Sequence, residues 1–242
     1  MEKPPKQRNI AYRRVRRPDP GLVARAARIP VSDLYEVLPA AVRDAAMMSP
    51  RMRPLVLGLH IAGPTVTARC APADNLMMHK ALQIAAAGDV LVVDGGEPSG
   101  AQWGTLAALY AERKRLAGVV VEGAIRDVDE LAARRYPVWS TAISPAHPDK
   151  CGAGAVNVPI HCGGVLVRPG DVICADGDGV LVLPQAELAA AVAKGEARMA
   201  HEDAAAAAIA AGNSLFDLHD LGRAFAASGV PEHDTHWDDE TE

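Results

Sequence analysis

The pattern of apolar and polar positions predicts that helices alternate with strands along the first half of the chain. Residues 32–46 are expected to form a helix. Residues 55–70 are rich in Val, Leu, Ile and Thr, and the interruptions at Gly58 and Gly63 predict two short strands rather than one. The further elements predicted for this half are a helix over 75–87, a strand over 89–94, a helix over 103–116, a strand over 118–123 and a helix over 128–135.

After Pro137 the pattern changes to short β runs separated by Gly, Pro and Asp. These runs cover residues 138–143, 154–159, 163–167, 171–175 and 179–183. An alanine-rich helix is predicted over 185–211, and a last helix over 215–227. The order β-α-β-α-β-α followed by a β-rich section predicts an α/β sandwich whose helices cover a sheet built from both parts. Because the alanine-rich helix has little apolar bulk, we expect it to lie on a neighbouring subunit.

Composition narrows the class of protein. The 242 residues are 49% hydrophobic, which excludes a disordered chain, and no run of about 18 apolar residues predicts a membrane span. The net charge of −5 argues against a partner nucleic acid. The four cysteines form no CxxC pair and no zinc spacing, and the first residues do not resemble a signal peptide. We therefore expect a cytoplasmic protein with reduced thiols.

Charge is concentrated at the two ends of the chain. Seven Lys and Arg residues lie between Lys3 and Arg17, whereas residues 232–242 are rich in Asp and Glu. The expected organisation is a basic arm over 1–30, an α/β domain over 31–184, C-terminal helices over 185–228 and an acidic tail over 229–242. The two end segments are interpreted as solvated tails, as arms that meet across a subunit boundary, or as a basic arm that contacts an anionic partner.

The candidate chemistry lies where a predicted strand ends. The strand that closes at Gly123 is followed by Arg126 and Asp127, and ligands of α/β sheets bind at the carboxyl ends of strands. Arginine binds carboxylates in bidentate fashion, and a neighbouring aspartate can hold Mg²⁺. The Gly-rich loop 95–104 leads into a helix whose free N–H groups form an anion site. Together these groups predict a receptor for a 2-oxo acid.

Simpler readings apply to the same residues. Asp127 alone would be a helix cap that pairs with Arg126. His79 either faces the pocket or is an ordinary core or surface histidine. Lys150 is a candidate partner for a distal carboxylate of the substrate, and Lys80 and Lys150 are the only lysines outside the arms and long helices that a Schiff-base route could use.

A set of motifs spread over residues 35–225 carries a family resemblance. They are Ala71-Pro-Ala-Asp-Asn75, Asp89-Val-Leu-Val-Val-Asp94, Gly104, Gly118-Val-Val-Val-Glu-Gly123 with Arg126-Asp127 and Glu130, Tyr136-Pro137-Val138, Gly154-Ala-Val-Asn-Val-Pro159, Gly163, Pro169-Gly-Asp-Val-Ile173 and Ala175-Asp-Gly-Asp-Gly-Val180. In this combination the chain resembles the RraA-like family. It is most similar to the class II pyruvate aldolases, which cleave 4-hydroxy-4-methyl-2-oxoglutarate or 4-carboxy-4-hydroxy-2-oxoadipate and decarboxylate oxaloacetate.

The resemblance implies a swivelling ββα sandwich with a C-terminal helical extension, assembled as a trimer or hexamer with sites at subunit interfaces. It implies that Arg126 binds the pyruvyl carboxylate and the enolate oxygen, and that Asp127 holds Mg²⁺ or Mn²⁺. The N–H groups of Leu106 and Ala107 would complete the carboxylate cradle after Gly104. Glu202 on the long helix is the best match for a glutamate that the family lends to a neighbouring site.

One position departs from the family pattern. The aldolases usually carry an acidic residue where this chain has Thr105, and threonine keeps hydrogen-bonding capacity without the charge. Thr105 is therefore still expected among the substrate-binding residues. Three functions follow: a metal-dependent aldolase and decarboxylase, a non-catalytic regulator that binds a protein partner, or a hydratase or isomerase of a related oxo acid. The C-terminal helices favour the enzyme, because the shorter regulators of the family lack them, and Thr105 favours the other two functions.

Overall fold

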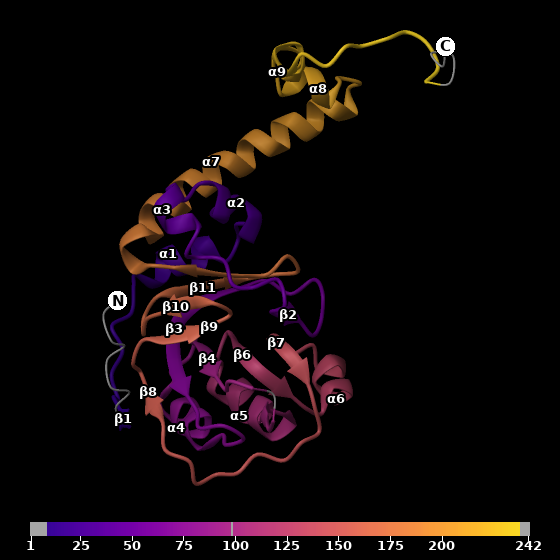
Figure 1. The fold of residues 1–242 in the computed structure, drawn as a ribbon. Coiled ribbons are helices and arrows are strands. Elements are labelled where there is room, and N and C mark those ends of the chain that lie inside the picture. The colour runs from indigo at the N-terminus through magenta and orange to yellow at the C-terminus, as the bar shows by residue number, and fades with distance from the viewer. Residues whose placement is uncertain (1–8, 98, 238–242) are drawn as a thin grey trace, which may run out of the picture. The chain divides into compact units, whose positions relative to one another are not determined.

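The computed structural model describes residues 9–97 and 99–237 (Figure 1). Part of the basic segment, residues 1–8, and the end of the acidic tail, residues 238–242, lie outside the described residues, as does Pro98 in the Gly-rich loop. The chain forms two compact units, Met1–Glu196 and Ala197–Glu242. In the described part of the chain no helix is long and apolar enough to cross a membrane.

A mixed β-sheet lies at the centre of the first unit. Four of its strands run parallel to their neighbours in the order β3 (Ile61–Arg69), β4 (Val90–Asp94), β6 (Gly118–Ile125) and β7 (Val138–Ile143). The short strand β5 (Ala101–Trp103) also pairs in parallel with β6. The central strands are almost continuously apolar because both faces of the sheet are covered.

Short strands extend this sheet on both sides. They are β1 (Ile10–Ala11), β2 (Arg53–Pro54), β8 (Ala155–Val156), β11 (Val172–Ala175) and β12 (Val180–Leu183), while β9 (Ile160–Cys162) and β10 (Val165–Val167) form a separate hairpin. Strand β3 joins the parts of the fold, because its first half pairs with β11 and its second half with β4.

Each face of the sheet has its own core. Helices α4 (Leu76–Ile84), α5 (Thr105–Lys114) and α6 (Val128–Ala133) cover one face with buried side chains such as Leu82 and Leu131. On the other face, Met48, Met52 and apolar residues of strands β9 to β12 pack against β4 and β6. The predicted α/β sandwich is therefore confirmed, with helices on one face of the sheet and β structure on the other.

The N-terminal segment is folded onto this unit from residue 10 onward. Helix α1 (Pro20–Ala26) is followed by buried Ile29, and the guanidinium of Arg17 binds the carboxylate of Asp89 through two hydrogen bonds of 2.8 and 2.7 Å. The reading of this segment as a solvated tail is therefore wrong for its described part.

Four predicted elements have clearly different bounds in the structure. The helix predicted over 32–46 is two short helices, α2 (Val31–Glu36) and α3 (Ala40–Arg43), because Pro39 disfavours helical geometry in the residue before it. The strand break predicted at Gly63 is absent. That glycine lies within β3, where a Cβ atom would collide with the carbonyl oxygen of Gly88.

The other two differences concern helix ends. The helix predicted from Trp103 begins two residues later, because Trp103 ends strand β5 and Gly104 precedes the helix. The last predicted helix is two, α8 (Leu215–Leu218) and α9 (Leu221–Ser228).

The second unit contains the end of α7 (Gln185–Ala210) together with α8 and α9. The buried residues of α7 all lie in its first half, within the first unit. In the second unit, the rings of Phe216 and Phe225 contact edge to face with centroids 6.3 Å apart. Other large apolar side chains there are exposed, including Leu215, Leu218 and Leu221. The packing of these helices on a neighbouring subunit stays a prediction.

Candidate active site

Two adjacent parallel strands bring the candidate residues together. Strand β5 ends at Trp103, and its neighbour β6 ends just before Arg126. The N–H of Arg126 donates to the carbonyl of Trp103 at 2.9 Å, which continues the pairing past the end of β6. The residues after both strands therefore share the carboxyl edge of the sheet, where ligands of α/β folds bind.

Asp127 links the two strand ends. Its Oδ2 accepts a hydrogen bond of 3.0 Å from the N–H of Thr105 at the start of α5, and lies 3.8 Å from Nε of Arg126. The backbone of Asp127 is left-handed, with φ 59° and ψ 36°, which is uncommon for a residue other than glycine. The side chains of Arg126 and Asp127 are 39% and 41% exposed, so both charges remain open to a ligand.

Gly104 gives this carboxylate its space. A Cβ at that position would lie 2.6 Å from Oδ2 of Asp127 and 3.2 Å from Cγ of Arg126, closer than real Cβ atoms approach an oxygen. The φ of Gly104 is −166°, an extended conformation that any residue adopts. The glycine therefore leaves room for this carboxylate because it has no side chain, and not because of its backbone freedom.

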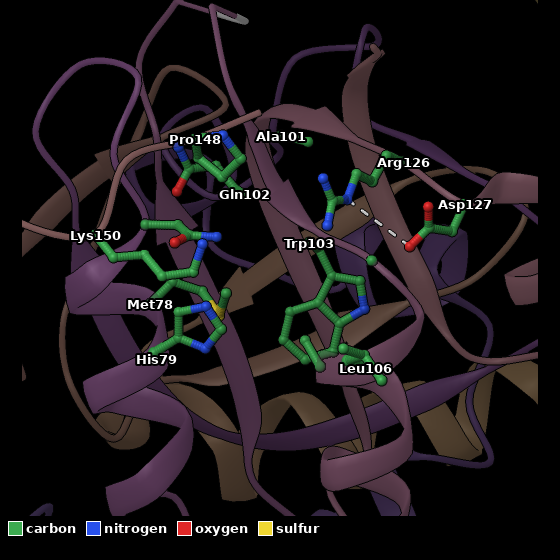
Figure 2. Close-up of a pocket in the computed structure, with 13 residues that line it drawn as sticks. Met78, His79, Ala101, Gln102, Trp103, Leu106, Arg126, Asp127, Pro148 and Lys150 are labelled. Carbon is green, nitrogen blue, oxygen red and sulfur yellow. Dashed lines mark ion pairs between the residues drawn. The ribbon is translucent and has the colours of Figure 1, made fainter. Parts of the chain in front are cut away.

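Arg126 and Asp127 border a cavity of about 180 Å³. Figure 2 shows these two residues on one side of the cavity and Pro148, Lys150 and His79 on the other. The full lining is Asn75, Met78, His79, Ala101, Gln102, Trp103, Gly104, Leu106, Ala107, Arg126, Asp127, Pro148 and Lys150. The first-turn N–H groups of Leu106 and Ala107 have no preceding helical turn to bind, so this end of the cavity suits an anion.

The far side of the cavity carries a second set of polar groups. The Nε2 of Gln102 donates to the carbonyl of Asp74 at 3.1 Å. Desolvation lowers the pKa of His79, and the positive charge of Lys150 lowers it further, so His79 is neutral near pH 7. The structure thus places His79 at the pocket rather than in the core or away from the site.

Several residues that line the cavity carry unpartnered buried polar atoms. Among the described residues, five buried side-chain atoms have no hydrogen-bond partner, and three of them belong to residues that line this cavity. They are Oδ1 of Asn75, Oε1 of Gln102 and Nε1 of Trp103. Since buried polar atoms are nearly always satisfied, a polar ligand that reached them would gain hydrogen bonds.

The donor set fits a cation that keeps much of its water. Within residues 9–97 and 99–237 no three or more His, Cys, Asp or Glu side chains gather as a metal-binding group. Mg²⁺ is commonly held by one or two carboxylates, with waters and substrate oxygens completing its shell. Asp127 offers one such partly exposed carboxylate beside the cavity, so it fits Mg²⁺ or Mn²⁺ but not a closed, all-protein metal centre.

Thr105 lies behind Asp127 and does not line the cavity. It is buried, and its hydroxyl donates to Oε2 of Glu130 at 3.1 Å while its N–H binds Asp127. Arg126, Asp127 and Glu130 also border a second, more open hollow of about 550 Å³. Thr105 therefore binds the carboxylates of both Asp127, just before α6, and Glu130, within α6, and adds no charge of its own.

Most of the predicted site residues are brought together. Gly104, Leu106, Ala107, Arg126, Asp127 and Lys150 all line the cavity. Glu202 lies in the second unit, where its carboxylate accepts a hydrogen bond of 2.8 Å from Arg198, and its role in a neighbouring site stays a prediction.

Sequence reasoning gave no role to Gln102 or Trp103. Trp103 had been assigned to a helix, and nothing in the sequence signalled Gln102. For Asn75 the sequence predicts a place in the Ala71–Asn75 motif and at the start of the helix over 75–87, but no role in the site.

Comparisons with known proteins find matches in sequence and in structure. A family model described as "RraA-like: Aldolase/RraA" matches residues 31–182. A relative from Halalkalibacterium halodurans, named "Putative 4-hydroxy-4-methyl-2-oxoglutarate aldolase", is 38% identical over 159 residues, which cover 65% of this chain and 76% of the relative. A relative of the same name from Burkholderia mallei is 42% identical over 144 residues, covering 59% of this chain and 86% of the relative.

Solved structures extend the likeness over more of the chain. An uncharacterized protein from Pseudomonas syringae superposes with a TM-score of 0.75 at 22% identity, covering 86% of this chain and 97% of that one, and shows the fold alone. RraAS2 from Streptomyces coelicolor, described as an unusual member of the RNase ES inhibitor RraA family, gives a TM-score of 0.69 at 30% identity, covering 78% and 98%.

Proposed function

Because the chain belongs to the RraA-like family, we propose that it is a divalent-metal-dependent aldolase. The proposed substrates are 4-hydroxy-4-methyl-2-oxoglutarate and 4-carboxy-4-hydroxy-2-oxoadipate, cleaved to pyruvate and a second oxo acid, with oxaloacetate decarboxylation as a related activity. The observation that carries this proposal is the meeting of Arg126, Asp127 and the start of α5 at one cavity. Relatives named for the first of these substrates support it.

The proposed reaction needs stabilisation of negative charge on the pyruvyl oxygen. Retro-aldol cleavage and decarboxylation both break a carbon–carbon bond and leave its electron pair on the enolate of pyruvate. Arg126 binds the pyruvyl carboxylate and the oxygen that gains charge, and the N–H groups of Leu106 and Ala107 hold the same carboxylate. Mg²⁺ or Mn²⁺, held by Asp127, supplies Lewis-acid stabilisation of the enolate when bound.

The far side of the cavity suits the rest of a branched diacid. In this proposal Lys150 pairs with the substrate's distal carboxylate, and its position across the cavity from Arg126 supports that role. The proposed assembly is a trimer or hexamer in which the helices of the second unit pack on a neighbour and Glu202 contributes to the neighbour's site. Exposed Leu215, Leu218 and Leu221 support such packing.

Pyruvate release tests the proposal. We expect release from 4-hydroxy-4-methyl-2-oxoglutarate and from oxaloacetate with Mg²⁺ or Mn²⁺, and its loss with EDTA. Arg126→Ala removes the proposed oxygen-binding cation, so turnover falls to background while the protein still unfolds cooperatively. Arg25→Ala is the matched control, because Arg25 pairs with Glu196 at 2.6 Å, is exposed and does not line the cavity. Full turnover in Arg126→Ala would overturn the assignment.

A second candidate function has support from the structural likeness. RraAS2, at 30% identity, is described as belonging to a family of RNase ES inhibitors. If the folded protein releases no pyruvate from either substrate, a regulator that binds a protein partner becomes the better proposal. Conversion of a related oxo acid without release of pyruvate would instead indicate a hydratase or isomerase.

A further inference from the structure

Asp74 carries a buried carboxylate beside the cavity. It contacts residues that line the cavity but is not itself one of them. Its side chain is almost fully buried, and it accepts three backbone hydrogen bonds. Oδ1 accepts from the N–H of Leu76 at 2.8 Å, while Oδ2 accepts from Cys151 at 2.6 Å and Gly152 at 2.7 Å. The first bond is local, but the other two come from a segment 77 and 78 residues away in sequence.

The backbone of the same segment makes a second set of contacts. The carbonyl of Asp74 accepts from Nε2 of Gln102, and Asp74 forms an isolated parallel bridge with Asp149. In that bridge the N–H of Asn75 donates to Asp149 at 3.0 Å, and Asp149 donates to Ala73 at 2.7 Å. Asp74 therefore connects the start of α4, the end of β5 and the loop around residue 150.

Each connected segment contributes to the far side of the cavity. Asn75 precedes α4, Gln102 belongs to β5, and Pro148 and Lys150 belong to the loop, and all four line the cavity. The loop is packed tightly against the carboxylate, because a Cβ at Gly152 would lie 2.8 Å from Cγ of Asp74. A small shift of this carboxylate would thus move the far side relative to Arg126.

The charge of Asp74 strengthens this arrangement. Desolvation alone would raise its pKa, but the three N–H donors and the positive charge of Lys150 outweigh that effect and lower the pKa below the ordinary value. The carboxylate is therefore ionised at neutral pH, and hydrogen bonds to an ionised acceptor are stronger than those between neutral groups.

A helix cap would explain only one of these bonds. Capping needs an acceptor for a first-turn N–H, which the bond to Leu76 supplies. The bonds to Cys151 and Gly152 instead fix the loop that carries Lys150. We propose that Asp74 is a positioning residue that sets the distance between Lys150 and Arg126, and so determines which length of diacid the cavity accepts. This inference rests on the proposed function.

The test compares binding of the whole substrate with binding of its pyruvyl end alone. In Asp74→Asn, the amide NH₂ replaces one acceptor oxygen, so at least one of the three N–H groups loses its partner. We expect KM for 4-hydroxy-4-methyl-2-oxoglutarate to rise about 10-fold or more, since misplacement of binding groups by an ångström has effects of that size. Inhibition by pyruvate, which has no distal carboxylate, should change by less than about twofold.

Three further variants complete the experiment. Gly152→Ala displaces the loop from the opposite side and should give the same split between long substrate and pyruvate. In a Lys150→Ala background, Asp74→Asn should have little further effect on KM. The matched control is Asp176→Asn, because Asp176 also accepts backbone N–H bonds, from Val31 and Asp178, but does not line the cavity. Asp176→Asn should lower the unfolding temperature but should not raise KM for the long substrate relative to inhibition by pyruvate.

The outcomes distinguish this inference from the function on which it rests. If the wild-type protein releases pyruvate but Asp74→Asn weakens pyruvate and the long substrate equally, Asp74 has only a structural role and the inference is overturned. An unchanged KM for the long substrate in folded Asp74→Asn and in folded Gly152→Ala overturns it as well. If the wild-type protein itself releases no pyruvate, the proposed function fails, and the inference falls with it.

Discussion

Gly104→Ala tests whether the position of the Asp127 carboxylate controls the site. The added Cβ would lie 2.6 Å from Oδ2 of Asp127, whereas real Cβ contacts under 3.0 Å are essentially never seen. The carboxylate must therefore recede by at least about 0.4 Å, which stretches its 3.0 Å hydrogen bond from Thr105 beyond the usual range for N–H···O contacts.

The two energetic consequences of this change have opposite signs and partly offset each other in the free energy of unfolding. Losing one hydrogen bond to a charged acceptor costs about 1.5–3 kcal/mol when it is buried, and less here because Asp127 is 41% exposed. Alanine can adopt the extended φ of −166° found at position 104. Because alanine leaves the unfolded chain less freedom than glycine does, this effect alone stabilises the protein by about 0.4–1 kcal/mol. We therefore expect a net loss near 1 kcal/mol, together with a fall in activity of about 10–100-fold, as for other losses around metal sites.

The assay pairs urea unfolding with Mn²⁺ binding followed by electron paramagnetic resonance and with pyruvate release. Gly179→Ala is the matched control, since the nearest atom to its added Cβ is Sδ of Met47 at an ordinary 3.7 Å. A Gly104→Ala protein with wild-type Mn²⁺ affinity and turnover would refute the reasoning.

Further predictions concern the fold and its pH dependence. Arg17→Ala leaves the carboxylate of Asp89, which is only 1% exposed, without the guanidinium that binds it. Because Arg17 is 36% exposed, water can enter, so we expect the free energy of unfolding to fall by about 3 kcal/mol, the low end of the range for broken buried pairs. This loss corresponds to a decrease of roughly 6–12 °C in Tm. Arg25→Ala removes an equally bidentate but exposed pair and should have a much smaller effect by thermal unfolding; equal effects would contradict the argument from burial. Because desolvation lowers the pKa of His79, protons bind the unfolded chain more strongly, and the free energy of unfolding should fall as the pH drops below the ordinary value of 6.5. His79→Gln should reduce this acid-side slope in urea titrations at pH 5 to 8, and an unchanged slope would show that His79 is not its source. Thr105→Val removes the hydroxyl that binds Glu130 and should lower turnover more than Thr105→Ser, which keeps it; equal turnover would show that the hydroxyl is dispensable.

Part of this site could be predicted because it depends on local sequence. Arg126 and Asp127 directly follow an apolar run that could only be a buried strand, so their place at the sheet edge followed from the rule for parallel strands. The Gly-rich loop 95–104 predicted the helix start after it, although two residues too early, and the family resemblance implied the role of the Leu106 and Ala107 N–H groups. Turn and strand positions after Pro137 were found because Gly, Pro and Asp separate short β-branched runs.

The far side of the cavity could not be predicted, because it depends on contacts between distant segments. The hydrogen bonds from Cys151 and Gly152 to Asp74 join segments more than 70 residues apart, and no periodic pattern in the sequence predicts them. Gln102 was missed since β5 is only three residues long, too short for an alternating pattern to identify. Likewise, the sequence identifies Arg17 only as one of several basic residues near the N-terminus. Its ion pair with the buried carboxylate of Asp89 depends on the fold.

Strand β3 has a consequence for how the chain folds. It pairs with β4 about 25 residues later along the chain and with β11 more than 100 residues later, so neither neighbour alone completes it. Contacts so distant in sequence slow folding, because a long loop must close before they form. Thr67 and Ala68 are fully buried in the half of β3 that lies beside β4 and β8, and their amide protons should therefore exchange with solvent only when the whole first unit opens.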